Sequence, residues 1–241
     1  MLNMKKNRIS YNIVIPDNIS NTQCANLETV MNLIKNESKL FKVGTLEINN
    51  VNESGLKKID RLFQKKIIRG FKIFPGHDPI YPTDQRWYPI YRLCIKYNFP
   101  LIIHTGINFN NRKISKYNDP EHIVKIAKIF PKLNIIIAHY FWPKFDYCFA
   151  ITNNIKNIYF DTSGLACPYI IKSSDGIRKI KDVLVKTVKR RANSLIFGSD
   201  WPIGSMKKHI DLINSLNITD GERNNIYYKN SIELFRLKNC L

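Results

Sequence analysis

Three polar residues lie at or shortly after the ends of short apolar runs, and their types suit metal binding and proton transfer. They are His104, His139 and Asp200. Two imidazoles and a carboxylate are suitable ligands for Zn²⁺ and similar ions, and an ion with an open position activates bound water near neutral pH. One histidine or the aspartate would then move the proton. Each residue also has a plainer interpretation, as a polar cap that only forms hydrogen bonds at a strand end.

These three residues can share a site only if the runs that precede them are neighbouring strands. Seven short runs rich in Ile, Val or Phe alternate with amphipathic helical segments, and each is typical of a strand buried on both faces. The runs are residues 9–16, 40–48, 68–74, 101–104, 135–139, 158–161 and 195–197. The alternation predicts a parallel sheet and a single α/β domain over residues 1–241 with a TIM-like (β/α) barrel. In such a barrel the carboxyl ends of all strands meet on one face, where active sites lie.

A closed barrel of this type has eight strands, and the sequence shows seven recognisable strand units. The first run begins almost at the N-terminus, so we expect the first strand–helix unit to be absent. Two unpaired sheet edges would then be exposed, and exposed edges invite association. The sequence therefore predicts a homo-oligomer or poor solubility.

Charge and cysteine content narrow the class of protein. With 38 Lys and Arg against 19 Asp and Glu, the net charge is +19, which attracts anionic partners. The basic residues are spread along the whole chain without a clustered stripe, so we do not expect a nucleic-acid role. No apolar run reaches about 18 residues, so no membrane span is expected. An odd number of widely spaced cysteines predicts a reducing cytoplasm rather than disulfides: Cys24, Cys94, Cys148, Cys167 and Cys240.

Several motifs in a fixed order resemble one known group of enzymes. They include GFKIFP at 70–75, HTG at 104–106, AH at 138–139 and FGSDWP at 197–202. Each is weak alone, but in series they resemble the amidohydrolase superfamily, specifically the amidohydrolase-related group with aromatic-acid decarboxylases and lactonases. The resemblance implies a metal-dependent hydrolase of C–O or C–N bonds, or a non-oxidative decarboxylase, acting on a small organic acid, lactone or amide.

The resemblance also assigns roles to the three strand-end residues. It implies that His104 is a metal ligand, that Asp200 is a metal ligand or proton acceptor, and that His139 is a second-metal ligand or the catalytic acid–base. The implied cofactor is a divalent ion, Zn with Mn or Fe as alternatives. Lys72 lies on the strand where some relatives carry a carboxylated, metal-bridging lysine, but the plainer interpretation is a lysine that lines the barrel mouth.

The chain departs from the family pattern at two places. Family members usually open with a strand that carries a His-x-His pair, and no such pair exists here, so an alternative is a catalytically impaired scaffold that lacks part of the metal site. The family often has glycine after the second motif histidine, whereas this chain has Tyr140-Phe141-Trp142. These side chains either narrow the pocket or pack as hydrophobic cover.

Four further residues are weaker candidates for contact with a small-molecule substrate. They are Lys72, His77, Asp161 and Trp201. His77 has a plainer interpretation as an exposed loop residue, and Asp161 as the cap of a turn. We expect His122 and His209 on the surface.

Overall fold

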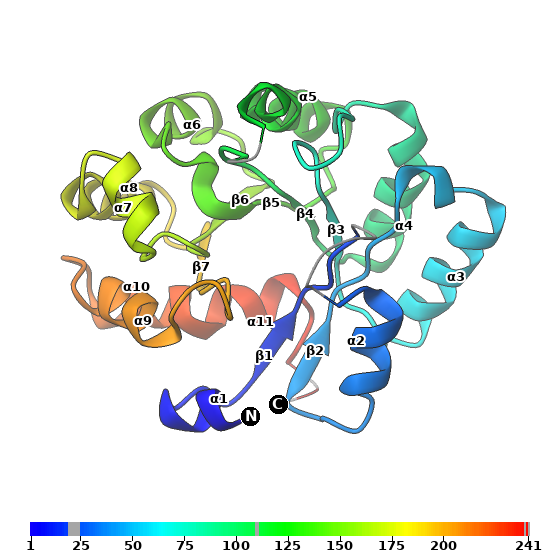
Figure 1. Ribbon diagram of the computed structural model, residues 1–241, viewed down its shortest axis with the longest axis horizontal. Coiled ribbons are helices and arrows are strands. Elements are labelled where there is room, and N and C mark those ends of the chain that lie inside the picture. The colour runs from blue at the N-terminus through cyan, green and yellow to red at the C-terminus, as the bar shows by residue number, and fades with distance from the viewer. Residues whose placement is uncertain (19–24, 109–110, 239, 241) are drawn as a thin grey trace.

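The computed structural model describes residues 1–18, 25–108, 111–238 and 240, and it confirms the predicted α/β barrel architecture. A strand lies within each of the seven apolar runs, and helices form an outer layer around the strands (Figure 1). The strands are β1 Asn12–Val14, β2 Leu40–Lys42, β3 Phe71–Ile73, β4 Leu101–Ile103, β5 Ile135–Ile137, β6 Ile158–Asp161 and β7 Leu195–Ile196.

All strand pairs are parallel and follow chain order. Strands β3 to β7 form a five-stranded sheet, and β1 and β2 form a two-stranded sheet. A single bridge between Gly44 and Phe71 joins the two sheets. Among the residues described, no strand pairing joins β7 to β1, so the barrel is open at one position.

Several helices begin where the sequence supplies a capping side chain. Asn26, Asn52, Asp119 and Ser205 each accept a hydrogen bond from a backbone N–H in the first turn of their helix, which satisfies a donor that the helix leaves unpaired. The predicted capping box of Thr219 with Glu222 is present. The helices are α1 Leu2–Lys6, α2 Leu27–Leu33, α3 Glu53–Gln64, α4 Tyr88–Tyr97, α5 Pro120–Ile129, α6 Phe145–Thr152, α7 Pro168–Ser173, α8 Ile177–Arg190, α9 Met206–Asn214, α10 Asp220–Asn224 and α11 Asn230–Leu234.

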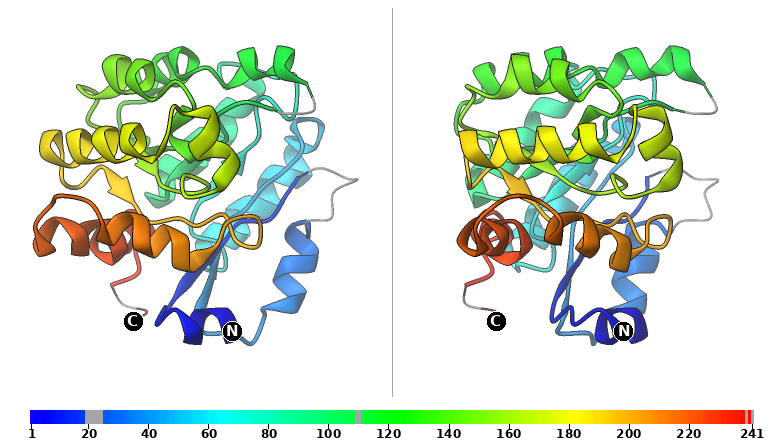
Figure 2. Two further views of the ribbon diagram at one scale, coloured as in Figure 1. Left: turned by 60° about the vertical axis from the view of Figure 1, so that its left-hand side comes forward. Right: turned by 90° about the vertical axis from the view of Figure 1, so that its left-hand side faces the viewer.

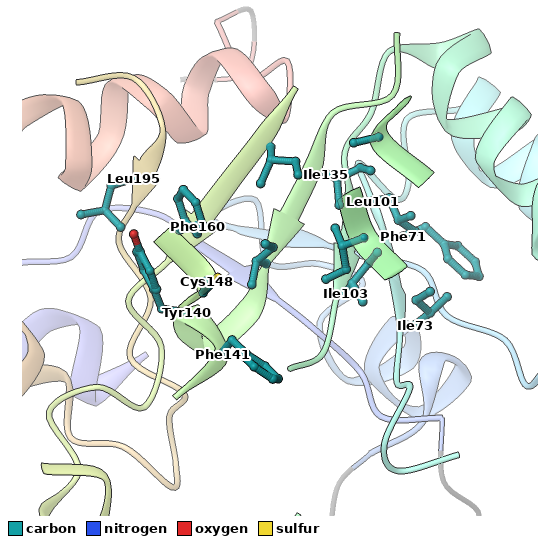
Figure 3. Close-up of a cluster of buried hydrophobic side chains, with 14 of the residues drawn as sticks. Phe71, Ile73, Leu101, Ile103, Ile135, Tyr140, Phe141, Cys148, Phe160 and Leu195 are labelled. Carbon is teal, nitrogen blue, oxygen red and sulfur yellow. The ribbon is translucent and has the colours of Figure 1, made fainter. Parts of the chain in front are cut away.

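Apolar side chains form one cluster outside the strands and another inside the barrel. Alternate residues of a strand point to opposite faces. Leu101 and Ile103 therefore face the helices, in the large cluster drawn in Figure 3, whereas Ile102 faces the barrel interior with Ile136. The interior cluster also contains residues from the end of the chain, Leu234, Phe235 and Leu237.

The C-terminal segment covers the outer edge of β7. The carbonyls of Ser194 and Ile196 bond to β6, so the polar groups of Leu195 and Phe197 point to the other side. There the Asn230 side chain donates to the Leu195 carbonyl at 2.8 Å, and the Phe197 N–H donates to the Ile226 carbonyl at 2.9 Å. Ile226 lies in a π-helical turn, Asn225–Lys229, between α10 and α11. The expectation of two unpaired edges is therefore wrong for β7.

The outer edge of β1 is different. Asn12 and Val14 bond to the neighbouring strand, through the Lys39 carbonyl and the Val43 N–H respectively, each at 3.0 Å. The backbone groups of Ile13 consequently point away from β2. Figure 2 shows β1 and α1 at one side of the molecule, away from the layer formed by α5 to α8.

Two other sequence features can be located in the described part of the chain. None of its helices is both long and apolar enough to cross a membrane. Cys94, Cys148, Cys167 and Cys240 are free thiols, while Cys24 lies outside the described residues.

Candidate functional site at the barrel mouth

The sheet register places His104 and Lys72 on the inner face of the barrel. Lys72 is in register with Ile102, and Ile102 belongs to the interior cluster. Residues at this level point inward, and so do residues two positions further along each strand. His104 is two positions beyond Ile102, at the carboxyl end of β4, so its ring lies above Lys72. Lys72 is only 5% exposed and forms part of the floor of the mouth.

The three strand-end residues of the sequence prediction converge on this mouth. The ring centroids of His104 and His139 are 5.0 Å apart with the rings nearly perpendicular. A Cβ on Gly164 would lie 3.6 Å from His139 Nδ1 and 3.9 Å from Asp200 Oδ2. Gly164, which has a positive φ of 78°, thus lies beside both the imidazole and the carboxylate.

His77 joins the same group from the loop after β3. Its ring centroid lies 4.2 Å from that of His104, edge to face, and its side chain is half-buried. It is therefore not the exposed loop residue of the plainer interpretation. Three imidazoles line one side of the mouth in the order His77, His104, His139.

The His139 ring is held in one tautomer by the loop after β6. Its Nδ1 lies 3.1 Å from the Ser163 carbonyl and 2.9 Å from the Ser163 hydroxyl. A carbonyl can only accept, so Nδ1 carries the proton, and Nε2 keeps a free lone pair for a ligand or a proton. Ser163 was missed by the sequence reasoning, although it lies two residues after the candidate Asp161.

Asp161 acts as the cap of a tight turn. Its Oδ1 accepts from the His139 N–H at 2.9 Å and from the Ser163 N–H at 3.0 Å. The Ser163 hydroxyl donates to the same oxygen at 2.5 Å. These bonds tie the loop after β5 to the loop after β6. The turn-capping interpretation accounts for one carboxylate oxygen, and contact of Asp161 with substrate stays a prediction.

Both His139 and Asp200 occupy left-handed backbone that non-glycine residues rarely adopt. Their φ angles are 59° and 60°, and Tyr140 and Phe141 continue the left-handed stretch at 52° and 54°. Such conformations cost on the order of 1–3 kcal/mol each and gather at functional sites. The bond from the His139 N–H to Asp161 holds this backbone.

Burial and mutual charge lower the pKa values of the basic groups in the mouth. The pKa of His104 falls well below its usual value, first because the ring is buried and then because His139, His77 and Lys72 lie near it. Burial also lowers the pKa of His77, and Asp17 opposes that shift. The imidazoles of His104 and His77 are therefore neutral at physiological pH and available as acceptors.

The Lys72 amine is buried in the floor of the mouth. Burial lowers its pKa, and the carboxylates of Asp161, Asp200 and Asp17 oppose the shift. Asp17, which follows β1, was not among the sequence candidates. The signal that points to it is the same as for the others, a polar residue shortly after an apolar run.

Trp201 is exposed, whereas Tyr140–Trp142 are buried. Trp201 is 54% exposed, and its contact with substrate stays a prediction. Tyr140 is fully buried against Phe160, with ring centroids 4.4 Å apart. A Cβ on Gly106 would lie 2.6 Å from Trp142 Nε1. The aromatic segment thus packs as hydrophobic cover, and the glycine of the HTG motif makes room for the indole.

The donor set fits a divalent ion only in part. Zinc sites usually have three or four protein ligands. In residues 1–18, 25–108, 111–238 and 240, no three His, Cys, Asp or Glu side chains are placed to hold one ion together. His104, His139 and Asp200 share a mouth but not one coordination point in this conformation, and their metal-ligand roles stay predictions.

A sequence model of the amidohydrolase family matches residues 29–237, most of the chain. The chain belongs to the amidohydrolase family. The three residues that converge on the barrel mouth, His104, His139 and Asp200, thus belong to the motifs that resemble this family. A search of curated proteins finds no match.

Solved structures similar to this amidohydrolase share its barrel. An uncharacterised TIM-barrel protein from Bordetella bronchiseptica is 20% identical with a TM-score of 0.81, over 98% of this chain and 80% of that one. A probable 2-pyrone-4,6-dicarboxylic acid hydrolase from Acinetobacter baumannii, with citric acid bound, is 14% identical with a TM-score of 0.71, over 98% and 86%. A 5-carboxyvanillate decarboxylase from Novosphingobium aromaticivorans, with bound manganese, is 13% identical with a TM-score of 0.66, over 98% and 80%. At these identities the likeness shows the fold.

Proposed function

We propose that this amidohydrolase is an enzyme that acts on a small organic acid, lactone or amide, either by hydrolysis of a C–O or C–N bond or by non-oxidative decarboxylation. The observation that carries the proposal is the convergence of His104, His139 and Asp200 on one barrel mouth. Two of these residues sit in strained backbone that neighbouring hydrogen bonds hold. The similar structures include both a probable hydrolase and a decarboxylase, which supports this class of reactions.

In this proposal His139 is the acid–base. Its Nε2 lone pair takes a proton from water in a hydrolysis, or its protonated form gives one to the carbon that loses carbon dioxide. The Ser163 contacts keep that nitrogen pointed away from the loop. Lys72 on the floor binds a substrate carboxylate through hydrogen bonds and charge, with His77, Asp161 and Trp201 as further substrate contacts.

We propose a divalent ion as cofactor, Zn, Mn or Fe, held by His104 and Asp200. His139 is the alternative third ligand, in which case its Nε2 would bind the ion and could not serve as the acid–base. When bound, it would polarise a carbonyl or make a hydroxide from water. The bound manganese of the similar decarboxylase supports a divalent ion in general rather than zinc in particular. Because three ligands do not yet meet at one point, binding requires rotation of these side chains or a ligand from outside the set.

Metal analysis and calorimetry test the cofactor. Purified protein is titrated with Mn²⁺ and Zn²⁺, and we expect one ion per chain, with binding lost in H104A and D200N. The matched control is H122A, because His122 lies on α5 against Tyr81, with ring centroids 4.6 Å apart and outside the mouth. Equal binding by H104A and H122A would reject the assigned ligands.

Turnover of a panel of small carboxylates and lactones tests the reaction. Release of carbon dioxide identifies a decarboxylase, and release of acid identifies a hydrolase. Loss of a general acid–base typically costs about 10²–10⁴-fold in rate, so H139Q should lose that much while H122Q keeps the parent rate. Parent-like turnover by H139Q would remove His139 from the proposed mechanism.

A second candidate is a catalytically impaired amidohydrolase scaffold. It is favoured by the absence of a three-ligand cluster among the residues that the structure describes. It predicts neither bound ion nor turnover, with binding of small acids retained and weakened by K72M. Stoichiometric metal with turnover would exclude it. A cytoplasmic location and a homo-oligomeric state stay predictions.

A further inference from the structure

His209 is a fully buried histidine outside the group at the mouth. It lies on α9 at 0% exposure, so the expectation that it is a surface residue is wrong. Its Nδ1 lies 2.8 Å from the Ser205 carbonyl, and its Nε2 lies 3.1 Å from the Ala166 N–H. The carbonyl can only accept and the amide can only donate, so the ring is neutral with its proton on Nδ1.

These two bonds join the loops that carry the proposed catalytic groups. Ala166 belongs to the loop after β6, which also contains Ser163 and Gly164. Ser205 ends the loop after β7, which contains Asp200. The imidazole therefore joins two loops, and its partner Ala166 lies 43 residues before it in the chain.

The ring also packs against the turn that holds Asp200. The Gly204 N–H donates to the Asp200 carbonyl at 2.8 Å, which closes a tight turn around the left-handed residue. A Cβ on Gly204 would lie 2.9 Å from His209 Cε1, so the ring lies directly on this turn. Any shift of the imidazole would be transmitted to the backbone of Asp200.

The position of Gly164 connects this arrangement to the mouth. Gly164 lies beside both His139 Nδ1 and Asp200 Oδ2, and its loop is held on one side by His209 at Ala166 and on the other by the Ser163 contacts to His139. The distance between the proposed acid–base and the carboxylate thus depends on where the loop after β6 stands relative to the loop after β7.

We propose that His209 is a positioning residue that sets the spacing of His139 and Asp200 by joining the loops after β6 and β7. Its part in catalysis rests on the proposed function, whereas its effect on the two loops does not. A residue of suitable size without polar atoms would fill the space, but it would leave the Ala166 N–H buried without an acceptor.

Amide hydrogen exchange of full-length H209F and H209Q tests the loop coupling. In H209F we expect exchange of peptides covering 162–167 and 198–205 to speed up at least about tenfold, the signature of local opening, while peptides covering 88–103 exchange as in the parent. H209Q keeps a polar atom that can accept from Ala166 and should recover most of the protection. The matched control is H122F, on α5, which should leave both loops unchanged.

The outcomes separate the alternatives. Unchanged exchange of the two loops in H209F, or a uniform acceleration over the whole chain, would overturn the proposal. So would equal exchange of H209Q and H209F. If H209F does not fold, H209Q is compared with the parent, and its unfolding midpoint in urea is measured as well. Retained protection at 162–167 is the expected result. Loss of that protection with an unchanged midpoint would contradict the proposal that the Gln side chain replaces the imidazole contact.

A nitrogen-correlated spectrum of the imidazoles gives a second readout. Because His139 Nδ1 contacts the same loop, its ring signals should move in H209F and return toward the parent in H209Q, and unmoved signals in H209F would count against the positioning role. If the parent shows turnover, kcat should fall more than KM rises. If the parent shows none, the proposed function fails while the exchange and spectral results still decide the role of His209.

Discussion

The two open edges of the barrel, at β7 and at β1, differ in what covers them. At β7 the side chain of Asn230 and the carbonyl of Ile226 bond to the outer edge. At β1 the outward backbone groups of Ile13 have no such cover in the described chain. The residues of β3, β4 and β5 are fully buried, whereas those of β1 and β2 are half-buried. Most residues of the proposed site thus lie at or after the ends of well-packed strands, although the barrel is open between β7 and β1.

The largest expected contrast is in core packing. Ile136 is fully buried inside the barrel, and removal of such a side chain typically costs about 2–5 kcal/mol because it leaves a cavity. I136A should lose that much free energy of unfolding in urea, while I13A, in the half-buried strand, should lose about 1 kcal/mol or less. Equal losses would show that β1 is as tightly packed as β5.

The cover of the β7 edge gives the next largest effect. N230A removes the donor to the Leu195 and Ala192 carbonyls, and buried groups left without a partner cost about 1–3 kcal/mol. Urea unfolding should show this loss for N230A and little change for N224A, an exposed asparagine of the same helical segment. A parent-like N230A would mean that the edge does not depend on its cover.

The free energy of unfolding should fall as the pH is lowered, and His209 should contribute to this fall. Burial lowers the pKa of His209. Below about pH 6.5 the unfolded chain takes up a proton that the folded chain does not, so the free energy of unfolding falls as the pH decreases. One such group contributes at most about 1.4 kcal/mol per pH unit.

Urea unfolding at pH 7.5, 6.5 and 5.5 measures this slope. H209Q should show a shallower loss than the parent over the lower interval, because its side chain does not titrate. Identical slopes for the two proteins would mean that His209 binds its proton equally in the folded and unfolded chains. His104 and His77 have pKa values lowered in the same direction, so part of the slope should remain.

The smallest expected effect concerns the outer edge of β1. I13P removes an N–H that points away from β2, so it should differ from I13A by no more than about 0.5 kcal/mol. V14P removes an N–H on the paired side and should cost about 1–3 kcal/mol. If I13P were as damaging as V14P, the Ile13 edge would be paired in solution, and light scattering would show whether a second copy supplies the partner.

The strands and the members of the proposed site were predictable because both follow from local pattern. Apolar runs located every strand in the described part of the chain, and parallel alternation requires the carboxyl ends of the strands to meet on one face. His104, His139 and Asp200 therefore converge as expected. His209 was misjudged because helical spacing shows which residues share a face but not what packs on that face.

The sequence by itself determined the order of strands and helices and the residues delivered to the barrel mouth, since these depend on periodicity and on the polar residue after each run. Tertiary structure alone decided that Asn230 would cover β7, that His209 would join two loops, and that Asp17 would act on Lys72 and His77. The physical reason is that each of these contacts joins segments far apart in the chain, at distances that local preferences do not encode.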